Sequence, residues 1–364
     1  MALQRRRRGA LLTAGAAVAV LATGGCGDEP PENRGSESPE TPLVTALSQV
    51  RFANQGYVEF GDLAAQRAAG MAPDDPTSPL YGYGWSSTAV RQGVVRRTLG
   101  LDGGKADRAL QIGRGRSAGR FDGADTAAVE AGARKLDGRK DGTIGPLDRW
   151  RLAPDDRIQP TGPLAALSPA GEFNVLGVGG GTVVRAPNGA LADELTADGK
   201  GDTLATDKRY RASAECLGTP LAALLDSDLT ASGEVGTYVL AAGVTGTDDA
   251  RLGQTACRTA LSKQAAEIVA EAVRERLRTG RTANAVPWSD LLTKTEVDVV
   301  TGSGPTYTVR LTATSRKSPR LILDLTRDGD LSTLFAGPPS LDHEGYPDSE
   351  ARSSLRILPL GLPE

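Results

Sequence analysis

Short apolar runs of strand or helix length alternate along the chain from residue 43 onward. Strand-like runs are expected at 57–60, 120–122, 173–178, 182–185 and 237–244. Apolar residues spaced three to four apart predict helices at 63–69, 89–99, 105–112, 125–136, 189–195 and 203–217. The polar, glycine-rich stretch 138–144 predicts a turn. Strands and helices are thus interspersed, as in an α+β protein.

The C-terminal part contains the longest helical pattern, over residues 258–278. Its apolar positions recur at helical spacing and predict one buried face made of Leu261, Ala265, Ile268, Ala272 and Val273. Gly280 marks its end. Three alternating segments follow at 296–300, 306–314 and 321–325, separated by turn residues. They predict an antiparallel meander that packs on the long helix.

The Pro-rich stretch 160–163 is the predicted border between two parts of the body. We expect a first α/β lobe at 43–160 and a second α+β lobe at 161–337, followed by an irregular tail at 338–364. The predicted fold is therefore α+β, with two small α/β lobes and a C-terminal antiparallel meander packed on a long helix.

The first 26 residues have the layout of an export signal. Arg5–Arg8 give a positive start, residues 9–21 are mostly apolar, and Gly24 and Gly25 precede Cys26. This segment resembles the lipobox signal of bacterial lipoproteins, although that family usually has leucine where this chain has Thr23. The resemblance implies a signal peptide at 1–25 and a lipid on Cys26. The alternative is a plain signal peptide cut near Gly25, which leaves Cys26 as a thiol.

Residues 26–42 contain Pro, Glu, Ser and Gly and almost nothing to bury, so we expect a disordered tether. A diacylglyceryl group on Cys26 would supply the two chains that stable membrane attachment needs. The other two cysteines, Cys216 and Cys257, are an even number in a chain expected to be exported, which predicts a disulfide. The alternative is two separate buried thiols.

Composition excludes several classes of function. The 364 residues include 42 Lys and Arg, 45 Asp and Glu, and one His. A net charge of −3 gives no electrostatic basis for nucleic-acid binding. Without the four leader arginines the balance is 38 basic to 45 acidic residues. One His and three Cys exclude most zinc, haem and histidine-based catalytic sites, so we assign no cofactor, metal or catalytic residue.

Three motifs are candidate sites of chemistry. Ser117 lies in a G-x-S-x-G match, but the only available base is His343, and the predicted helix-to-strand context is the reverse of a hydrolase elbow. The glycines at 177–181 lie between two strands and predict a hairpin turn instead of a phosphate loop. The acidic stretch 324–330 lacks the spacing of an EF-hand loop, so a turn explains it better than calcium.

The stretch 80–86 has alternating aromatic residues and glycines. As a strand it would place Tyr81, Tyr83 and Trp85 on one face, where they could stack on sugar rings. The alternative is that these rings belong to the core.

Residues 204–211, Leu-Ala-Thr-Asp-Lys-Arg-Tyr-Arg, and the alternation of lobes resemble exported bacterial lipoproteins of unknown function. The resemblance carries over no catalytic residue. We expect a lipoprotein on the extracytoplasmic face of the cell membrane, with a non-enzymatic binding or assembly role. Its partners would be the membrane and an envelope protein or glycan. The alternatives are a solute-binding lipoprotein of a transporter and an envelope hydrolase.

Overall fold

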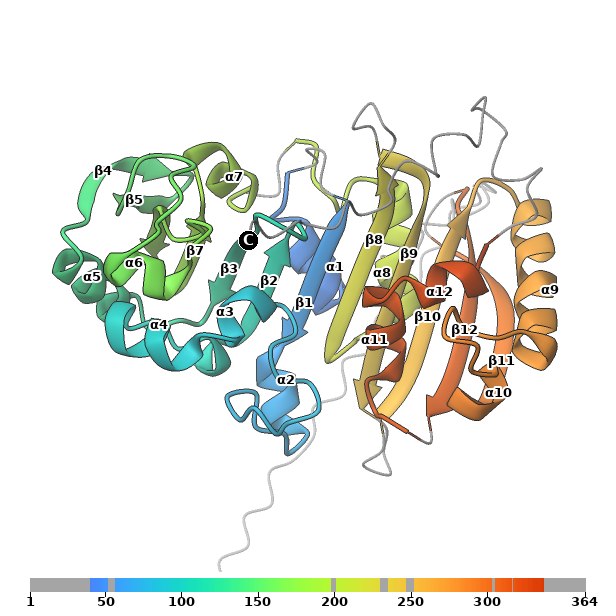
Figure 1. The fold of residues 1–364 in the computed structure, drawn as a ribbon. Helices are drawn as coiled ribbons and strands as arrows, with labels where there is room; N and C mark the ends of the chain where they lie inside the picture. The colour runs from blue at the N-terminus through green and yellow to red at the C-terminus, as the bar shows by residue number, and fades with distance from the viewer. Residues whose placement is uncertain are drawn as a thin grey trace, which may run out of the picture. The chain divides into compact units, whose positions relative to one another are not determined.

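Twelve strands form one antiparallel sheet in the computed structural model, which describes residues 40–51, 56–197, 201–229, 235–246, 252–302, 305–315 and 317–336 (Figure 1). The strand order is β11-β12-β10-β9-β8-β1-β2-β3-β7-β6-β5-β4. The strands are β1 (Tyr57–Asp62), β2 (Arg108–Ile112), β3 (Ala118–Asp122), β4 (Arg139–Ile144), β5 (Leu147–Arg151), β6 (Val175–Gly179), β7 (Thr182–Ala186), β8 (Ala222–Leu229), β9 (Val235–Gly246), β10 (Leu252–Ala260), β11 (Leu292–Thr301) and β12 (Tyr307–Ser315).

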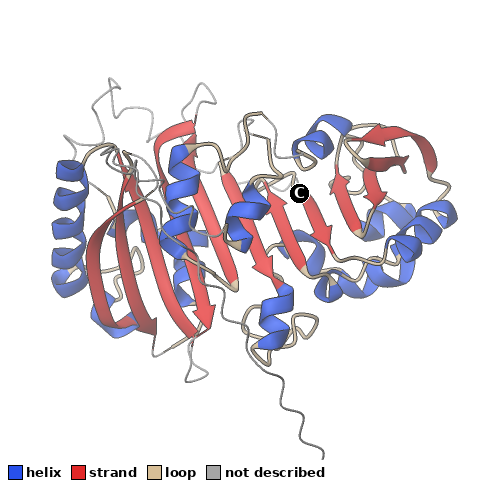
Figure 2. Ribbon diagram, turned by 180° about the vertical axis from the view of Figure 1, so that it is seen from behind, coloured by secondary structure: helices blue, strands red, loops and turns tan. Residues whose placement is uncertain are grey.

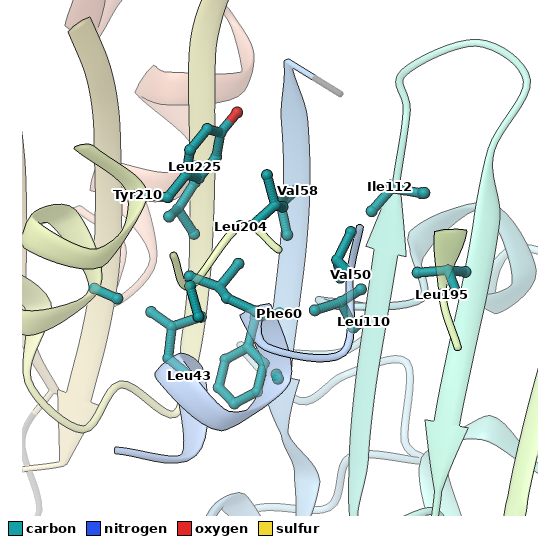
Figure 3. Close-up of a cluster of buried hydrophobic side chains, with 14 of the residues drawn as sticks. Leu43, Val50, Val58, Phe60, Leu110, Ile112, Leu195, Leu204, Tyr210 and Leu225 are labelled. Carbon is teal, nitrogen blue, oxygen red and sulfur yellow. The ribbon is translucent and has the colours of Figure 1, made fainter. Parts of the chain in front are cut away.

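Helices cover both faces of this sheet. One face carries a single apolar cluster under α1 (Pro42–Leu47), α7 (Gly189–Glu194) and α8 (Lys208–Leu217). Figure 2 shows this face, and Figure 3 shows Leu43, Val58, Phe60, Leu110 and Tyr210 meeting there. Because β1 and β2 contribute apolar side chains to it, the cluster continues across the middle of the sheet.

The opposite face carries two separate apolar clusters. One lies under α2 (Leu63–Ala68), α3 (Ser86–Ala89), α4 (Gln92–Leu99), α5 (Thr126–Lys135) and α6 (Gly162–Leu167). The other lies under α9 (Lys263–Thr279), α10 (Trp288–Leu291), α11 (Leu321–Arg327) and α12 (Asp330–Leu334). The central strands β1 and β8 run between α3 and α11 (Figure 1). A short 3-10 helix spans Gly103–Lys105.

The chain contains the same topological unit twice. In each unit five strands lie in the order first, second, third, fifth, fourth: β1-β2-β3-β7-β6 in the first unit and β8-β9-β10-β12-β11 in the second. A helix precedes the first strand of each unit, α1 or α8, and a helix follows the third, α5 or α9. The two first strands, β1 and β8, pair with each other at the centre of the sheet.

The matching helices also begin in the same way. Asp125 caps α5 by accepting a hydrogen bond from the Ala128 N–H, and Ser262 caps α9 by accepting from the Ala265 N–H. The first unit differs by insertions. Helices α2–α4 lie between β1 and β2, and β4, β5 and α6 lie between α5 and β6.

The predicted α+β class is confirmed, with a large antiparallel sheet. The predicted lobes do not coincide with the two topological units, because the unit border lies between Ala186 and Lys208. Residue 160 falls between β5 and β6, which are hydrogen-bonded neighbours. Pro42, placed at the end of the predicted tether, is the first residue of α1.

Several predicted elements were wrong. Residues 105–112 were expected as a helix but contain β2, and 138–144 were expected as a turn but contain β4. The third strand of the predicted meander, 321–325, lies in α11, and β10 is the actual neighbour of β12. The stretch 80–86 contains turns and the start of α3 in place of a strand.

The long helix exists, but it begins later and turns a different face inward. It starts at Lys263, and residues 252–260 form β10. Its buried residues are Ala266, Val269, Ala270 and Val273. Leu261 and Ile268, predicted to be buried, are exposed.

The predicted disulfide is confirmed. Cys216 of α8 is bonded to Cys257 of β10, with 6.4 Å between their Cα atoms. The bond links α8 to β10 on the face of the sheet that carries the single apolar cluster. Among the described residues, no helix has both the length and the apolar character needed to cross a membrane.

Candidate functional site

One row of paired residues crosses the sheet from β7 to β12. In the first unit Arg185 pairs with Gly119, Gly119 with Gln111, and Gln111 with Glu59. Glu59 pairs with Leu224 of β8, where the second unit begins. Paired residues on neighbouring strands direct their side chains to the same face. We call Glu59, Gln111 and Arg185 the polar row.

The second unit has apolar residues in the same row. Leu224 pairs with Ala242, Ala242 with Ala256, and Ala256 with Leu311, and all four lie in one buried cluster. Because the row starts at the two central strands and runs outward in both units, these residues are equivalent to Glu59, Gln111, Gly119 and Arg185. The second unit shows that this fold needs no polar group here.

The polar row therefore carries a free-energy cost that the fold does not require. Glu59 is 2% exposed, Gln111 3% and Arg185 0%. Burying a charge costs several kcal/mol unless it is paired and hydrogen-bonded. Buried polar residues that the fold itself does not need are expected at functional positions. The polar row is therefore the candidate site.

Arg185 is held by oxygens from several elements. Its Nη1 donates to the Ser117 carbonyl at 3.1 Å, and its Nη2 donates to Gln111 Oε1 at 3.1 Å and to Ser87 Oγ. The carboxylate of Glu172 lies 3.8 Å away. Burial lowers the pKa of the Arg185 guanidinium, and the negative charges of Glu172 and Glu59 oppose that shift.

Ser117 and Glu172 close this end of the row. The Ser117 hydroxyl donates to Glu172 Oε1, and Ser168 Oγ donates to Glu172 Oε2 at 3.1 Å. Ser117 lies in the loop between β2 and β3, and Glu172 lies between α6 and β6. Both oxygens of the buried carboxylate are thus hydrogen-bonded, as buried polar groups usually are.

The inserted helix α3 supplies the middle of the network. Ser87 donates from its hydroxyl to Gln111 Oε1 at 2.8 Å, and Gln111 Nε2 donates to Ser86 Oγ at 3.2 Å. Ser86 and Ser87 are half-buried, so this is where the network approaches the surface. The insertion between β1 and β2 therefore provides groups that the polar row needs.

Glu59, at the other end, contacts a residue far away in the sequence. Tyr57 Oη donates to Glu59 Oε1 at 2.7 Å, and Arg327 Nη2 of α11 donates to the same oxygen at 3.3 Å. The second oxygen, Oε2, is buried and has no hydrogen-bond partner among the described residues.

Aromatic rings and carboxylates surround the two guanidinium groups at this end. The Arg327 guanidinium carbon lies 4.9 Å from the centre of the Tyr83 ring, and that of Arg114 lies 4.4 Å from the Tyr57 ring. Tyr83 Oη donates to Asp324 Oδ1 at 3.0 Å. Burial raises the pKa of the Tyr57 phenol, and the charge of Glu59 raises it further.

The predicted serine candidate belongs to this network, but it is not arranged as a nucleophile. Ser117 is 1% exposed, and its hydroxyl is hydrogen-bonded to a carboxylate and lies 3.3 Å from a guanidinium nitrogen of Arg185. A nucleophilic serine needs access to substrate and an adjacent base. His343 lies outside the described residues, as does Cys26.

The three predicted platform residues do not form one exposed surface. Trp85 is 0% exposed and Tyr83 1%, and they belong to different clusters, as the core alternative requires. Tyr81 is half-buried, with its ring centre 5.4 Å from that of Trp85. Of these three residues, only Tyr83 contacts Arg327, the partner of Glu59.

The other two motifs are accounted for by local structure. Gly180 and Gly181 both have positive φ in the tight turn between β6 and β7, so the predicted hairpin is confirmed. Asp324 is paired with Arg320, and Asp330 accepts a hydrogen bond from the Ala283 N–H. Within the described ranges, no group of three or more His, Cys, Asp or Glu side chains could hold a metal ion.

Sequence reasoning missed Glu59, Gln111, Glu172 and Arg185. The available signal was one polar residue inside each apolar strand, as in Tyr57-Val58-Glu59-Phe60 and Thr182-Val183-Val184-Arg185. It was unspecific, because such a residue faces solvent in any strand with one exposed face. Comparison with protein-family models, curated proteins and solved structures gives no significant match to this chain.

Proposed function

We propose that this chain is an exported lipoprotein, anchored through Cys26 on the extracytoplasmic face of the cell membrane, with a non-enzymatic binding or assembly role. The N-terminal segment supports the export step, because a basic start, an apolar run and Gly24-Gly25-Cys26 are typical of lipoprotein signals.

The observation that carries the proposal is the disulfide between Cys216 and Cys257. Disulfides form and persist in oxidising compartments and are rare in the cytosol. A chain that is exported and then folds outside the membrane would form this bond. The disulfide and the signal segment are independent features, and both favour the same location.

The polar row supports a binding role over an enzymatic one. Its charges are paired within the protein: Arg185 with Glu172, and Arg327 with Glu59. The hydrolase alternative has less support, because Ser117 is buried. The solute-binding alternative also has less support, since Tyr83 and Trp85 are buried and do not line an interlobe cleft.

Metabolic labelling with palmitate tests the anchor. We expect the wild type and a Ser38→Ala variant of the predicted tether to incorporate label, and a Cys26→Ala variant to incorporate none. The protein should fractionate with membranes in the first two cases and be released in the third. Equal labelling of all three variants, or of none, would contradict the anchor.

A further inference from the structure

The side chain of Arg327 is surrounded by groups that are suited to binding a cation. Its guanidinium lies over the Tyr83 ring, donates to Glu59 and is next to the Tyr57 hydroxyl. A carboxylate with an aromatic face is the arrangement that binds guanidinium groups in proteins, because the planar group can hydrogen-bond at its edge and stack on its face. We call Tyr57, Glu59 and Tyr83 the cation box.

The three box residues are buried, whereas the side chain that fills the box is not. Tyr57 is 6% exposed, Glu59 2% and Tyr83 1%. The Arg327 side chain is 40% exposed and belongs to the last residue of α11. A long side chain at a helix end can leave by rotating about its own bonds, while the box stays in place.

Glu59 also keeps an acceptor that Arg327 does not use. The hydrogen bonds from Tyr57 and Arg327 both end on Oε1 of the carboxylate, and the buried Oε2 has no partner among the described residues. A guanidinium group placed squarely on the carboxylate would reach both oxygens, as bidentate pairs do. The box is therefore better suited to such a group than to the single contact that Arg327 makes.

We propose that the cation box is a binding site for the guanidinium group of an arginine side chain on a peptide or protein partner, and that Arg327 fills it until that partner displaces it. This inference rests on the proposed binding role and names the chemistry that the partner presents. It does not depend on the lipid anchor.

The test compares arginine analogues on the full chain. N-acetyl-arginine amide carries the guanidinium, N-acetyl-citrulline amide has its shape without charge, and N-acetyl-lysine amide has its charge without the planar fork. We expect the Arg327→Ala variant to bind the arginine analogue at least about tenfold more tightly than the citrulline or lysine analogue. The wild type should bind it about tenfold more weakly than Arg327→Ala, because its own side chain competes.

The matched control is the double variant Arg327→Ala/Glu59→Gln, which should lose the preference for the arginine analogue. Equal binding of the three analogues to Arg327→Ala, or an undiminished preference in the double variant, would overturn the proposal. Palmitate labelling of Cys26 is unaffected by these substitutions. A negative result here with Cys26 labelled would therefore overturn the ligand class alone.

A second measurement covers the case in which Arg327→Ala does not fold. In the wild type, the side-chain N–H resonance of Arg327, assigned with Arg327→Lys, should shift as N-acetyl-arginine amide is added. The resonance of Arg67, which pairs with Asp107 outside the box, should not shift. An Arg327 resonance that stays unchanged to saturating concentrations would contradict displacement.

Discussion

A guanidinium group with no exposure to water, such as that of Arg185, depends on the protein for its hydrogen bonds, and its Nε has no partner among the described residues. Ser87, Gln111 and Ser117 provide oxygen acceptors, and Glu172 provides the opposite charge. Leu311 shows what the same position contains when only packing is required. The comparison shows that the backbone arrangement shared by the two units does not require a charged residue at this position.

We expect Arg185→Leu to lower the free energy of unfolding by about 3–5 kcal/mol, because it leaves the Glu172 carboxylate buried without its cation. The double variant Arg185→Leu/Glu172→Leu should recover part of that loss, since both charges are then gone. Urea unfolding at neutral pH measures both values.

Arg96→Leu is the control for this prediction. Arg96 pairs with Asp102 at the surface, with its side chain 57% exposed, and its loss should change the free energy by less than about 1 kcal/mol. A loss at Arg185 as small as that at Arg96 would show that the buried pair contributes nothing to stability.

At the scale of whole elements, the sequence pattern predicted best where one face is buried and one is exposed. Helix α5, predicted at 125–136, spans Thr126–Lys135. Strand β2 was mistaken for a helix because Leu110 and Gln111 point to opposite faces and both are buried, so polar alternation is lost. The predicted strand 321–325 has only five residues. That is too few to distinguish the two-residue repeat of a strand from the 3.6-residue repeat of a helix.

The sequence singled out two residues in or next to the candidate site, Ser117 and Tyr83, and assigned a catalytic role to neither. Ser117 drew attention through its glycine-flanked motif, and the disulfide followed from counting cysteines. Glu59 and Arg327 could not be connected, because their contact joins β1 to the end of α11 and only the sheet topology brings them together. The same holds for Arg185 and Gln111, which meet through pairing with Gly119.

Breaking the disulfide should loosen α8 first. It closes a loop of 41 residues, so Cys216→Ser/Cys257→Ser should lower the free energy of unfolding by about 4 kcal/mol. Hydrogen exchange should rise in α8 more than in α5, which has no such bond. Thiol titration of the denatured, unreduced wild type should find neither sulfhydryl; two titrating thiols would contradict the bond.

At the scale of the whole molecule, the buried phenols of Tyr57, Tyr83 and Tyr210 make stability depend on alkaline pH. Burial raises the pKa of Tyr210 to about 12 and also raises the pKa of Tyr57 and of Tyr83. An unfolded phenol titrates near a pKa of about 10. Above that pH the unfolded state loses protons that the folded state keeps, so folding becomes less favourable.

We expect the free energy of unfolding to be constant with respect to these groups below about pH 10. It should then fall by about 1.4 kcal/mol per pH unit for each buried phenol. Urea unfolding at pH 9 and pH 11 measures the change. Tyr210→Phe should reduce the slope, whereas Thr295→Ala, at an exposed position of β11, should leave it unchanged. An unchanged slope in Tyr210→Phe would contradict the assignment.

The pairing of β1 with β8 has a consequence for how the chain acquires its structure. Val58 and Leu225 are partners, although a complete unit of sheet lies between them in the sequence. Closing so long a loop is entropically costly, and contacts of this kind slow folding. Each unit can form its local hairpins early, but β1 keeps one open edge until β8 arrives. The join between the units is therefore expected to be the last step of folding, and the step at which an unfinished molecule is most exposed to pairing with another copy.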